Sequence, residues 1–172
     1  MVRVWLLGAC LASLGTHALG QDVVVVPNAN ANTVGGDTSG SLPSSPISAE
    51  IEAVLGAGQF STGPIYLTGF SWRAAPGTGP LSVTFTGNVY VSTSLTYPNT
   101  NGGGKTLLST TFANNVGPDK TLVFSGTFTM SSAGCNVAGT TPCPWANAVI
   151  FTTPFYYNSA NGPLLIDLQA HC

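Results

Sequence analysis

Charged side chains are scarce in this chain of 172 residues. They make up 6% of the sequence, and the formal net charge is −2, whereas about a quarter of the residues in an average soluble protein are charged. Only four residues are Lys or Arg, too few to form the basic patch that neutralises phosphates. We therefore expect no nucleic acid partner, and we expect hydroxyl and amide groups to keep the surface hydrated.

Histidine is equally scarce. The chain has two; His17 lies in the N-terminal segment and His171 lies next to the C-terminus. A Ser-His-Asp hydrolase needs an internally placed histidine as general base, so this shortage argues against such an enzyme. It also argues against a metal site built on the cysteines. The sequence predicts no catalytic residue, no metal and no cofactor.

The first twenty residues have the pattern of a secretory signal peptide. Arg3 supplies a positive start, residues 4–14 supply an apolar core, and small residues stand three and one positions before Gln21. The apolar run is too short for a permanent membrane span, which needs about 20 residues. We predict a helical signal peptide over residues 1–20, and hence a secreted or cell-surface protein with no transmembrane anchor in the mature chain.

Three of the four cysteines follow the predicted cleavage site. Cys135 and Cys143 bracket a loop that contains Gly and Pro, and an oxidising compartment would let them pair. Cys172 has no evident partner. Cys10 ends a Leu-Gly-Ala-Cys stretch that resembles a lipobox, but few apolar residues precede it. We predict a Cys135–Cys143 disulfide, with lipidation of Cys10 as an alternative to cleavage after Gly20.

The remainder of the chain alternates between short β-rich segments and turn clusters. The segments are rich in β-branched and aromatic residues, and Gly, Pro and Asn separate them. This spacing, with no linker, predicts one all-β domain over residues 21–172, an antiparallel β-sandwich of jelly-roll-like character. Alternation within residues 121–130 places Leu122, Phe124, Phe128 and Met130 on the core face and Val123 on the other face. The main expected strands cover residues 22–26, 47–55, 65–73, 81–94, 106–112, 121–130, 148–155 and 164–168.

Two glutamates are the best candidates for catalysis. Glu50 and Glu52 would lie on one face of the expected strand 47–55, about 7 Å apart, near the separation at which glycosidase carboxylates cooperate. The plainer interpretation is a solvated strand face, because no aromatic residue stands beside them in the sequence to bind a sugar. A glycoside-active enzyme is therefore the third of the functional hypotheses.

Aromatic residues offer another route to function. Rings that line one face can stack on sugar rings, although such residues more often serve as core or rim packing. Trp72, Trp145 and Tyr156 are the candidates for sugar binding. They make a carbohydrate-binding module the second hypothesis, with extracellular polysaccharide or cell-envelope components as partners.

Several segments together resemble a known group of proteins. They are IEAVLGAGQFSTGPIYLTGFSWR, VYVSTS, LLSTTFANNVGPDKTLVFSG and FTTPFYYNSANGPLLIDL. In this order they resemble uncharacterised secreted bacterial proteins of acidobacteria and planctomycetes, many of which carry a C-terminal PEP-CTERM tail for exosortase sorting. The resemblance covers about residues 21–168. It implies a jelly-roll-like fold, export and a role at the cell surface or in the extracellular matrix, with no assigned catalytic residues.

The sequence departs from this group at its C-terminus. Members with the sorting tail continue past the last strand into more β structure, whereas Ala170-His171-Cys172 ends this sequence. Anchoring by that route is therefore in doubt, and we expect a truncated or a released form. The leading hypothesis is an exported, non-enzymatic β-sandwich protein with a structural or adhesive role.

Overall fold

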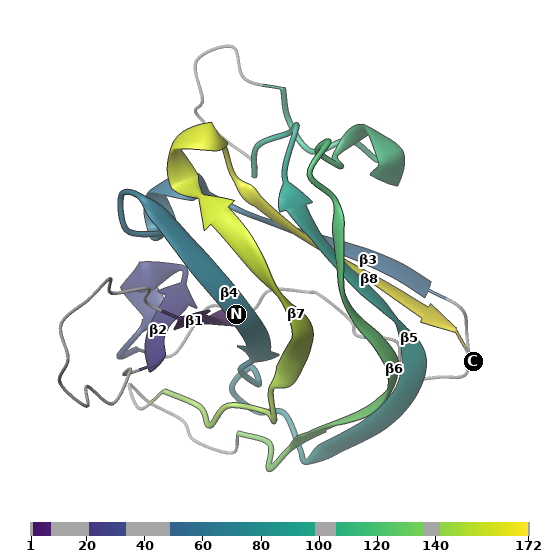
Figure 1. Cartoon of the computed structure of the whole chain (residues 1–172). Coiled ribbons are helices and arrows are strands. Elements are labelled where there is room, and N and C mark those ends of the chain that lie inside the picture. Colours follow the sequence, from purple (N-terminus) through teal and green to yellow (C-terminus); the bar gives the residue numbers. More distant parts are fainter. Residues whose placement is uncertain (1, 8–20, 34–48, 99–105, 136–141, 172) are drawn as a thin grey trace, which may run out of the picture.

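The computed structural model describes residues 2–7, 21–33, 49–98, 106–135 and 142–171. These residues form two four-stranded antiparallel sheets packed as a sandwich, which confirms the predicted all-β fold (Figure 1). Four short 3-10 turns connect the strands: η1 (Asn28–Asn30), η2 (Ala57–Gln59), η3 (Phe112–Asn114) and η4 (Ser159–Asn161). The strands are β1 (Val2–Leu7), β2 (Gln21–Val26), β3 (Ala49–Leu55), β4 (Pro64–Trp72), β5 (Leu81–Thr93), β6 (Thr121–Ser132), β7 (Val149–Asn158) and β8 (Leu164–His171).

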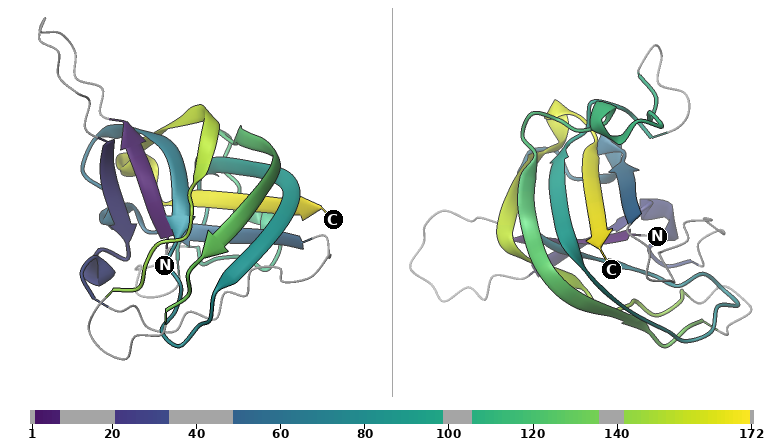
Figure 2. Two further views of the ribbon diagram at one scale, coloured as in Figure 1. Left: turned by 90° about the horizontal axis from the view of Figure 1, so that it is seen from below. Right: turned by 90° about the vertical axis from the view of Figure 1, so that its right-hand side faces the viewer.

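Consecutive strands mostly alternate between the two sheets. Sheet A has the order β2-β1-β4-β7, and sheet B has the order β3-β8-β5-β6. At one side of the sandwich β6 and β7 come together, where the Asn147 side-chain amide donates a hydrogen bond to the Thr129 carbonyl at 2.6 Å. The long strands β5 and β6 curve around this side (Figure 2). The order is that of a jelly roll, in which the chain winds between two sheets.

The core lies between the sheets and follows the alternation of the strands. In β5, Phe85, Val89 and Val91 are buried as the sequence predicts, because side chains two apart share one face. Edge-to-face aromatic contacts fill the space, such as Phe85 on Phe128 with ring centroids 4.0 Å apart. Other large members of the core are Leu67, Phe70, Met130, Phe151, Phe155, Tyr157, Leu164, Ile166 and Leu168.

A β-bulge reverses the predicted faces of two residues in β6. Val89 lies opposite Phe124 and Tyr90 lies opposite Leu122, so Val123 is an extra residue in the ladder. Val123 is fully buried, whereas Leu122 is 44% exposed. The predicted core position of Leu122 is therefore wrong. Beyond the bulge the prediction holds, since Phe124 and Phe128 pack against the core and Met130 is buried.

Residues 106–112 form no β-strand, contrary to the sequence-based expectation. They belong to the long connection from β5 to β6, which contains η3 and touches its neighbours through isolated bridges such as Tyr97 with Leu107. Leu107 and Leu108 are exposed. A β-rich composition alone did not decide the structure, because among the described residues no ladder of partners runs along this segment.

The N-terminal segment Val2–Leu7 forms strand β1 instead of the helix expected of a signal peptide. It lies between β2 and β4, visible as the purple strand in the left view of Figure 2. Val2 lies opposite Val26 of β2 and Trp72 of β4, and both pairings are antiparallel. Residues 8–20, with the predicted cleavage site and Cys10, lie outside the described residues, so cleavage after Gly20 stays a prediction.

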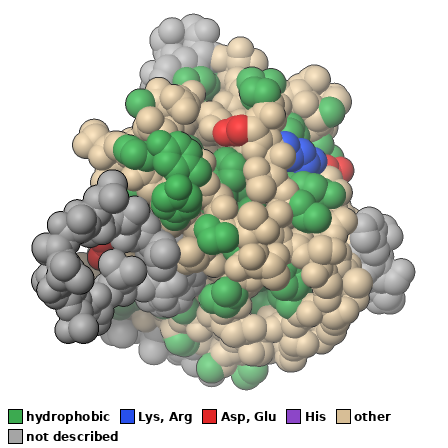
Figure 3. Space-filling model, in the orientation of Figure 1, with side chains coloured by type: hydrophobic (Ala, Val, Ile, Leu, Met, Phe, Trp, Pro, Cys, Tyr) green, Lys and Arg blue, Asp and Glu red, His purple; other side chains and the backbone are tan. Residues whose placement is uncertain are grey.

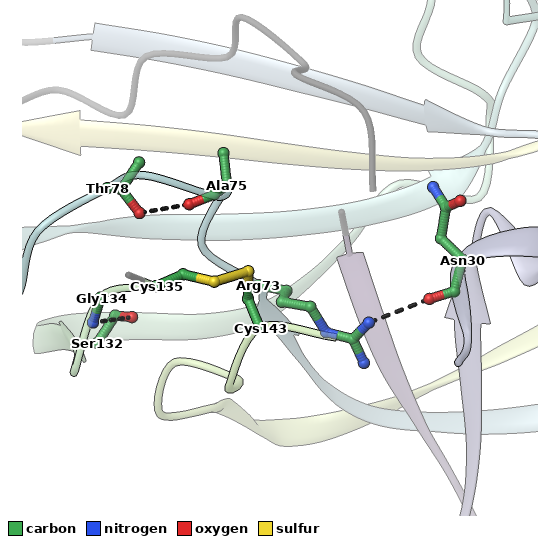
Figure 4. Close-up of a disulfide and its surroundings, with 8 residues drawn as sticks. All are labelled: Asn30, Arg73, Ala75, Thr78, Ser132, Gly134, Cys135 and Cys143. Carbon is green, nitrogen blue, oxygen red and sulfur yellow. Dashed lines mark hydrogen bonds between the residues drawn. A yellow bond between two sulfur atoms is a disulfide. The ribbon is translucent and has the colours of Figure 1, made fainter. Parts of the chain in front are cut away.

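The predicted disulfide between Cys135 and Cys143 is present, with their Cα atoms 5.4 Å apart. Cys135 is also tied to the β4–β5 connection by two backbone hydrogen bonds, because its N–H donates to Thr78 and its carbonyl accepts from Gly77, both at 2.7 Å. Figure 4 shows Arg73 beside the disulfide, with its guanidinium directed away from the sulfurs toward the Asn30 carbonyl, to which it donates at 3.0 Å. The disulfide thus fastens a junction of several loops. Cys172 lies outside the described residues.

Candidate functional site

Three carboxylates meet on neighbouring strands of sheet B. Glu52 of β3 lies opposite Asp167 of β8, and Glu50 lies opposite Gln169. Each of the three acids offers an oxygen that lies within 4.8 Å of the other two. The glutamates therefore share a strand face, as predicted, but the third member was missed. Asp167 interrupts the apolar run LLIDL, and that single charge in a strand is the signal that could have found it.

Asp167 is the best-compensated acid of the cluster. It is 1% exposed, and a buried carboxylate is costly unless other groups bind it. Lys120 donates to its Oδ2 atom at 2.9 Å, and the Gln169 amide donates to the same atom at 3.0 Å. The Lys120 ammonium also lies 4.2 Å from the centre of the Tyr90 ring, a favourable cation–π distance.

Glu52 is held mainly by an amide. The Asn115 side-chain nitrogen donates to Glu52 Oε2 at 2.6 Å. Burial raises the pKa of the Glu52 carboxyl above its ordinary value; the hydrogen bond from Asn115 opposes this, and the charges of Asp167 and Glu50 add to it. Glu52 therefore protonates more readily than an ordinary glutamate does.

Asn115 connects this cluster to the β5–β6 connection. It is fully buried. Its side-chain oxygen accepts hydrogen bonds from the Thr96 hydroxyl at 3.0 Å and from the Ser109 N–H at 2.8 Å. Its nitrogen donates to the Ser109 carbonyl at 3.0 Å as well as to Glu52. All the hydrogen-bonding capacity of this buried amide is thus used to fasten an irregular segment to β3.

The cluster has the donor chemistry of a cation site but is already used by the fold. Carboxylate oxygens are the ligands that calcium prefers, and two oxygens, Glu52 Oε1 and Asp167 Oδ1, are buried with no hydrogen-bond partner among the described residues. However, Lys120 and Asn115 already hold the other oxygen of each group. We therefore interpret the cluster first as a polar tie between the sheet and its connecting segment.

A pair of exposed tyrosines forms a second candidate site, on sheet A. Tyr156 of β7 lies opposite Tyr66 of β4. Their ring centroids are 5.4 Å apart in an edge-to-face arrangement, and the side chains are 53% and 40% exposed. Figure 3 shows a large hydrophobic patch over the end of β7, within a surface of mostly neutral polar atoms. Tyr66 was not predicted from the sequence, because its partner lies ninety residues away in the chain.

The structure does not bring the three predicted sugar-binding aromatics together. Trp72 packs edge-on against Phe70, with centroids 4.6 Å apart, and is partly buried. Trp145 stacks with Arg73, whose guanidinium carbon lies 4.1 Å from the ring centroid. Both tryptophans lie at the far end of β4, about 20 Å along the strand from Tyr66. Of the three, only Tyr156 belongs to the exposed pair.

Comparisons with protein families, with curated proteins and with solved structures gave no match. Within the described ranges, no helix is long and apolar enough to span a membrane. The case for a function therefore rests on the surface and on the strand order of this chain.

Proposed function

We propose that this chain is an exported, non-enzymatic β-sandwich protein with an adhesive role at the cell surface or in the extracellular matrix, and that polysaccharide contacts the Tyr66–Tyr156 pair. The observation that carries the proposal is the pair itself. Two paired rings stay exposed on a sheet face, and exposed apolar groups that gather on a soluble protein commonly mark an interaction site. A tyrosine presents both an apolar ring and a hydroxyl, as contact with a sugar requires.

The remaining outer surface supports a neutral, hydrophilic partner. Threonines that lie opposite each other on β5 and β6 form hydroxyl–hydroxyl hydrogen bonds. Thr84 and Thr129 are 2.7 Å apart, and Thr86 and Thr127 are 2.6 Å apart, measured between their Oγ1 atoms. All four side chains are exposed. A surface built from hydroxyl groups has little charge with which to attract ions or nucleic acid, and it resembles the hydroxyl-rich surface of a polysaccharide.

The disulfide and the acid cluster support export and a non-catalytic role respectively. Disulfides persist in oxidising compartments outside the cytoplasm, and the Cys135–Cys143 bridge fits that setting. Lys120 and Asn115 hold Asp167 and Glu52 as parts of a fixed network. This use favours a structural role over glycoside cleavage by Glu50 and Glu52.

Retention on insoluble polysaccharides tests the proposal. We expect Tyr156→Ala and Tyr66→Ala each to weaken retention about five- to tenfold, because each removes one ring contact of roughly 1 kcal/mol. Tyr156→Phe keeps the ring and should stay close to the unmodified chain. Phe112→Ala, at an exposed ring elsewhere, is the matched control. Unchanged retention in both tyrosine-to-alanine variants would remove the sugar-binding role.

A further inference from the structure

A row of three side chains crosses the face of sheet B that points away from the core. Asp167 of β8 lies opposite Glu52 of β3 on one side and opposite Tyr90 of β5 on the other. Residues that lie directly opposite each other share a face, with Cβ atoms about 4.5–5.5 Å apart. Lys120, the last residue before β6, reaches this row, and its Nζ atom lies 2.9 Å from Asp167 Oδ2. An amine and two acids thus meet at one place.

The Lys120 amine is held between the carboxylate and an aromatic ring. Its Nζ atom lies 4.2 Å from the centre of the Tyr90 ring, which limits the positions open to the end of this side chain. Because Oδ2 is bonded to Cγ of Asp167, a small rotation of Lys120 brings Nζ to about 3–3.5 Å from Cγ, the separation of groups that are poised to react. The geometry therefore suits attack of the amine on the acid as well as an ion pair.

Two carboxylate oxygens beside this contact lack hydrogen-bond partners. Asp167 Oδ1 and Glu52 Oε1 are both buried, and neither has a partner in the part of the chain that the structure describes. One proton held between the two acids would give both oxygens a partner. Burial raises the pKa of the Glu52 carboxyl, which favours the proton on Glu52. A proton near Oδ1 and an ammonium on Oδ2 both draw electron density from Cγ, so Cγ becomes more open to a nucleophile.

Burial also favours an amide over the ion pair. The Asp167 side chain is 1% exposed, and a carboxylate and an ammonium that leave water each lose hydration that their attraction must offset. An amide carries no charge, and its burial costs far less when it is hydrogen-bonded. The Lys120 side chain is 33% exposed, so a water molecule released at this place has a path to solvent.

We propose that Lys120 and Asp167 become joined by an intramolecular amide bond, an isopeptide bond between Lys120 Nζ and Asp167 Cγ, and that Glu52 relays the protons. The two residues are 47 positions apart in the sequence, so the bond ties the start of β6 to the inner strand β8. The reaction takes place within one folded chain. It goes beyond the proposed function, because the tyrosine pair on sheet A takes no part in it.

The step is a condensation that releases one water molecule. Lys120 gives a proton to Asp167 Oδ2 along their hydrogen bond, which leaves a neutral amine and a neutral carboxyl group. Nζ then bonds to Cγ, while Oδ1 takes a proton from Glu52 and Nζ gives one to Glu52. The bond between Cγ and Oδ1 breaks as Glu52 protonates Oδ1 again and takes the proton from Oδ2. Of the three ammonium protons, one stays on the amide and two leave in the water, and Glu52 ends protonated as it began.

The amide oxygen keeps an existing contact. Oδ2 remains on Cγ as the carbonyl oxygen, and the Gln169 side-chain nitrogen already donates to Oδ2 at 3.0 Å. The oxygen that departs, Oδ1, is the one without a partner among the described residues. The product therefore retains the hydrogen bond that the fold supplies and removes a buried oxygen that it leaves unsatisfied.

Intact mass tests the proposal. The full chain is produced in a secreting host, its N-terminus is sequenced, and the mass of the reduced protein is compared with the mass of that sequence. We expect a deficit of one water, about 18 Da, and one branched chymotryptic peptide that contains both Lys120 and Asp167. Lys120→Arg is the matched control, because arginine keeps the positive charge but does not form this amide. It should show no such deficit.

The part played by Glu52 has its own variant. Glu52→Gln keeps an oxygen that can accept from Asn115 but cannot relay protons, so we expect the deficit in under about a tenth of the molecules. The missing bond lowers the stability of this variant equally at every pH, and the pH-dependent contribution of the Glu52 carboxyl adds to that constant difference.

Three results would overturn the proposal. They are an unmodified chain at its full sequence mass, a deficit that persists in Lys120→Arg, and a branched peptide that joins other residues. Full bond formation in Glu52→Gln would remove Glu52 from the reaction. None of these results bears on retention by polysaccharide, which tests the proposed function separately.

Discussion

Sheets A and B have the same number of strands but differ in how those strands are supplied. Sheet B takes all four from residues 49–171, and its inner strand β8 pairs with β3 and β5 without any register shift. Sheet A takes one inner strand from residues 2–7, and both pairings of β4 contain a shift. Sheet B is therefore complete within the predicted mature chain, whereas sheet A depends on a segment that export would remove.

This difference separates the sheet that depends on the N-terminal segment from the sheet that does not. The buried strand β8 lies between β3 and β5 in sheet B. It carries the core residues Leu164, Ile166 and Leu168. Sheet A adds the exposed tyrosine pair and the place of β1. Stability should therefore respond most to changes in sheet B, and binding should respond most to changes in sheet A.

The largest expected effect comes from proline in an inner strand. Ile166 of β8 lies between Ala53 of β3 and Val91 of β5, so Ile166→Pro should cost about 3 kcal/mol or more and unfold the exported chain. Val24→Pro in β2 should cost under about 1 kcal/mol in a chain without residues 1–20, because β1 is the strand with which β2 pairs. Urea unfolding midpoints measure both. Equal losses at the two positions would contradict the comparison.

The disulfide should stabilise the molecule independently of sheet A. Replacing both Cys135 and Cys143 with serine should lower the free energy of unfolding by about 2.5 kcal/mol, the chain-entropy estimate for a loop of this length. The same loss is expected with and without residues 1–20, because neither cysteine takes part in the pairing of β1 with β2. Urea titrations of both forms of the chain check this, and a loss that differs between the two forms would count against it.

Close packing within sheet B gives the next effect. A Cβ atom at Gly87 would collide with the backbone oxygen of Gln169 on β8, so Gly87→Ala should destabilise by about 2 kcal/mol, as overpacking does. Gly79→Ala is the matched control, because nothing lies within 4 Å of a Cβ atom there. Thermal unfolding distinguishes the two. A Gly87→Ala variant as stable as the control would show that β5 and β8 can separate at this point.

The smallest effect concerns the pH dependence of the acid cluster. Burial raises the pKa of Glu52 above 4.5, so the folded state binds this proton more tightly than the unfolded state does. Its contribution is therefore present at low pH and is lost as the pH rises through the raised value. Glu52→Gln should gain stability relative to the unmodified chain between about pH 4 and pH 7, by less than about 1 kcal/mol. A stability difference between the two chains that stays constant over that pH range, as measured by thermal unfolding, would contradict this expectation.

Local sequence patterns predicted most of the strands but not the contacts between them. Alternation in β5 and in most of β6 was enough to assign core faces, because one side of each strand is apolar. The exchange of Leu122 and Val123 could not be foreseen, since a bulge is a property of two paired strands. The expected strand at residues 106–112 failed for the same reason, since no strand in the described part of the chain pairs along it.

The candidate sites were only half predicted. Glu50, Glu52 and Tyr156 were identified because they stand in recognisable local patterns. Asp167 and Tyr66 were not, because pairing of distant segments brings them to those sites. The use of Val2–Leu7 as a strand likewise depends on its pairing with β2 and β4 and not on the signal-like pattern of the segment itself.

Hydrogen exchange in the exported chain tests the difference between the sheets most directly. Amides of Pro64–Trp72 in β4 and of Leu164–His171 in β8 can be followed by mass spectrometry, with and without the peptide of residues 2–7. We predict fast exchange of the β4 amides that face away from β7, which slows when the peptide binds, and slow exchange along β8 in both states. Equally slow exchange in β4 and β8 without peptide would show that sheet A is already complete, and it would contradict the account.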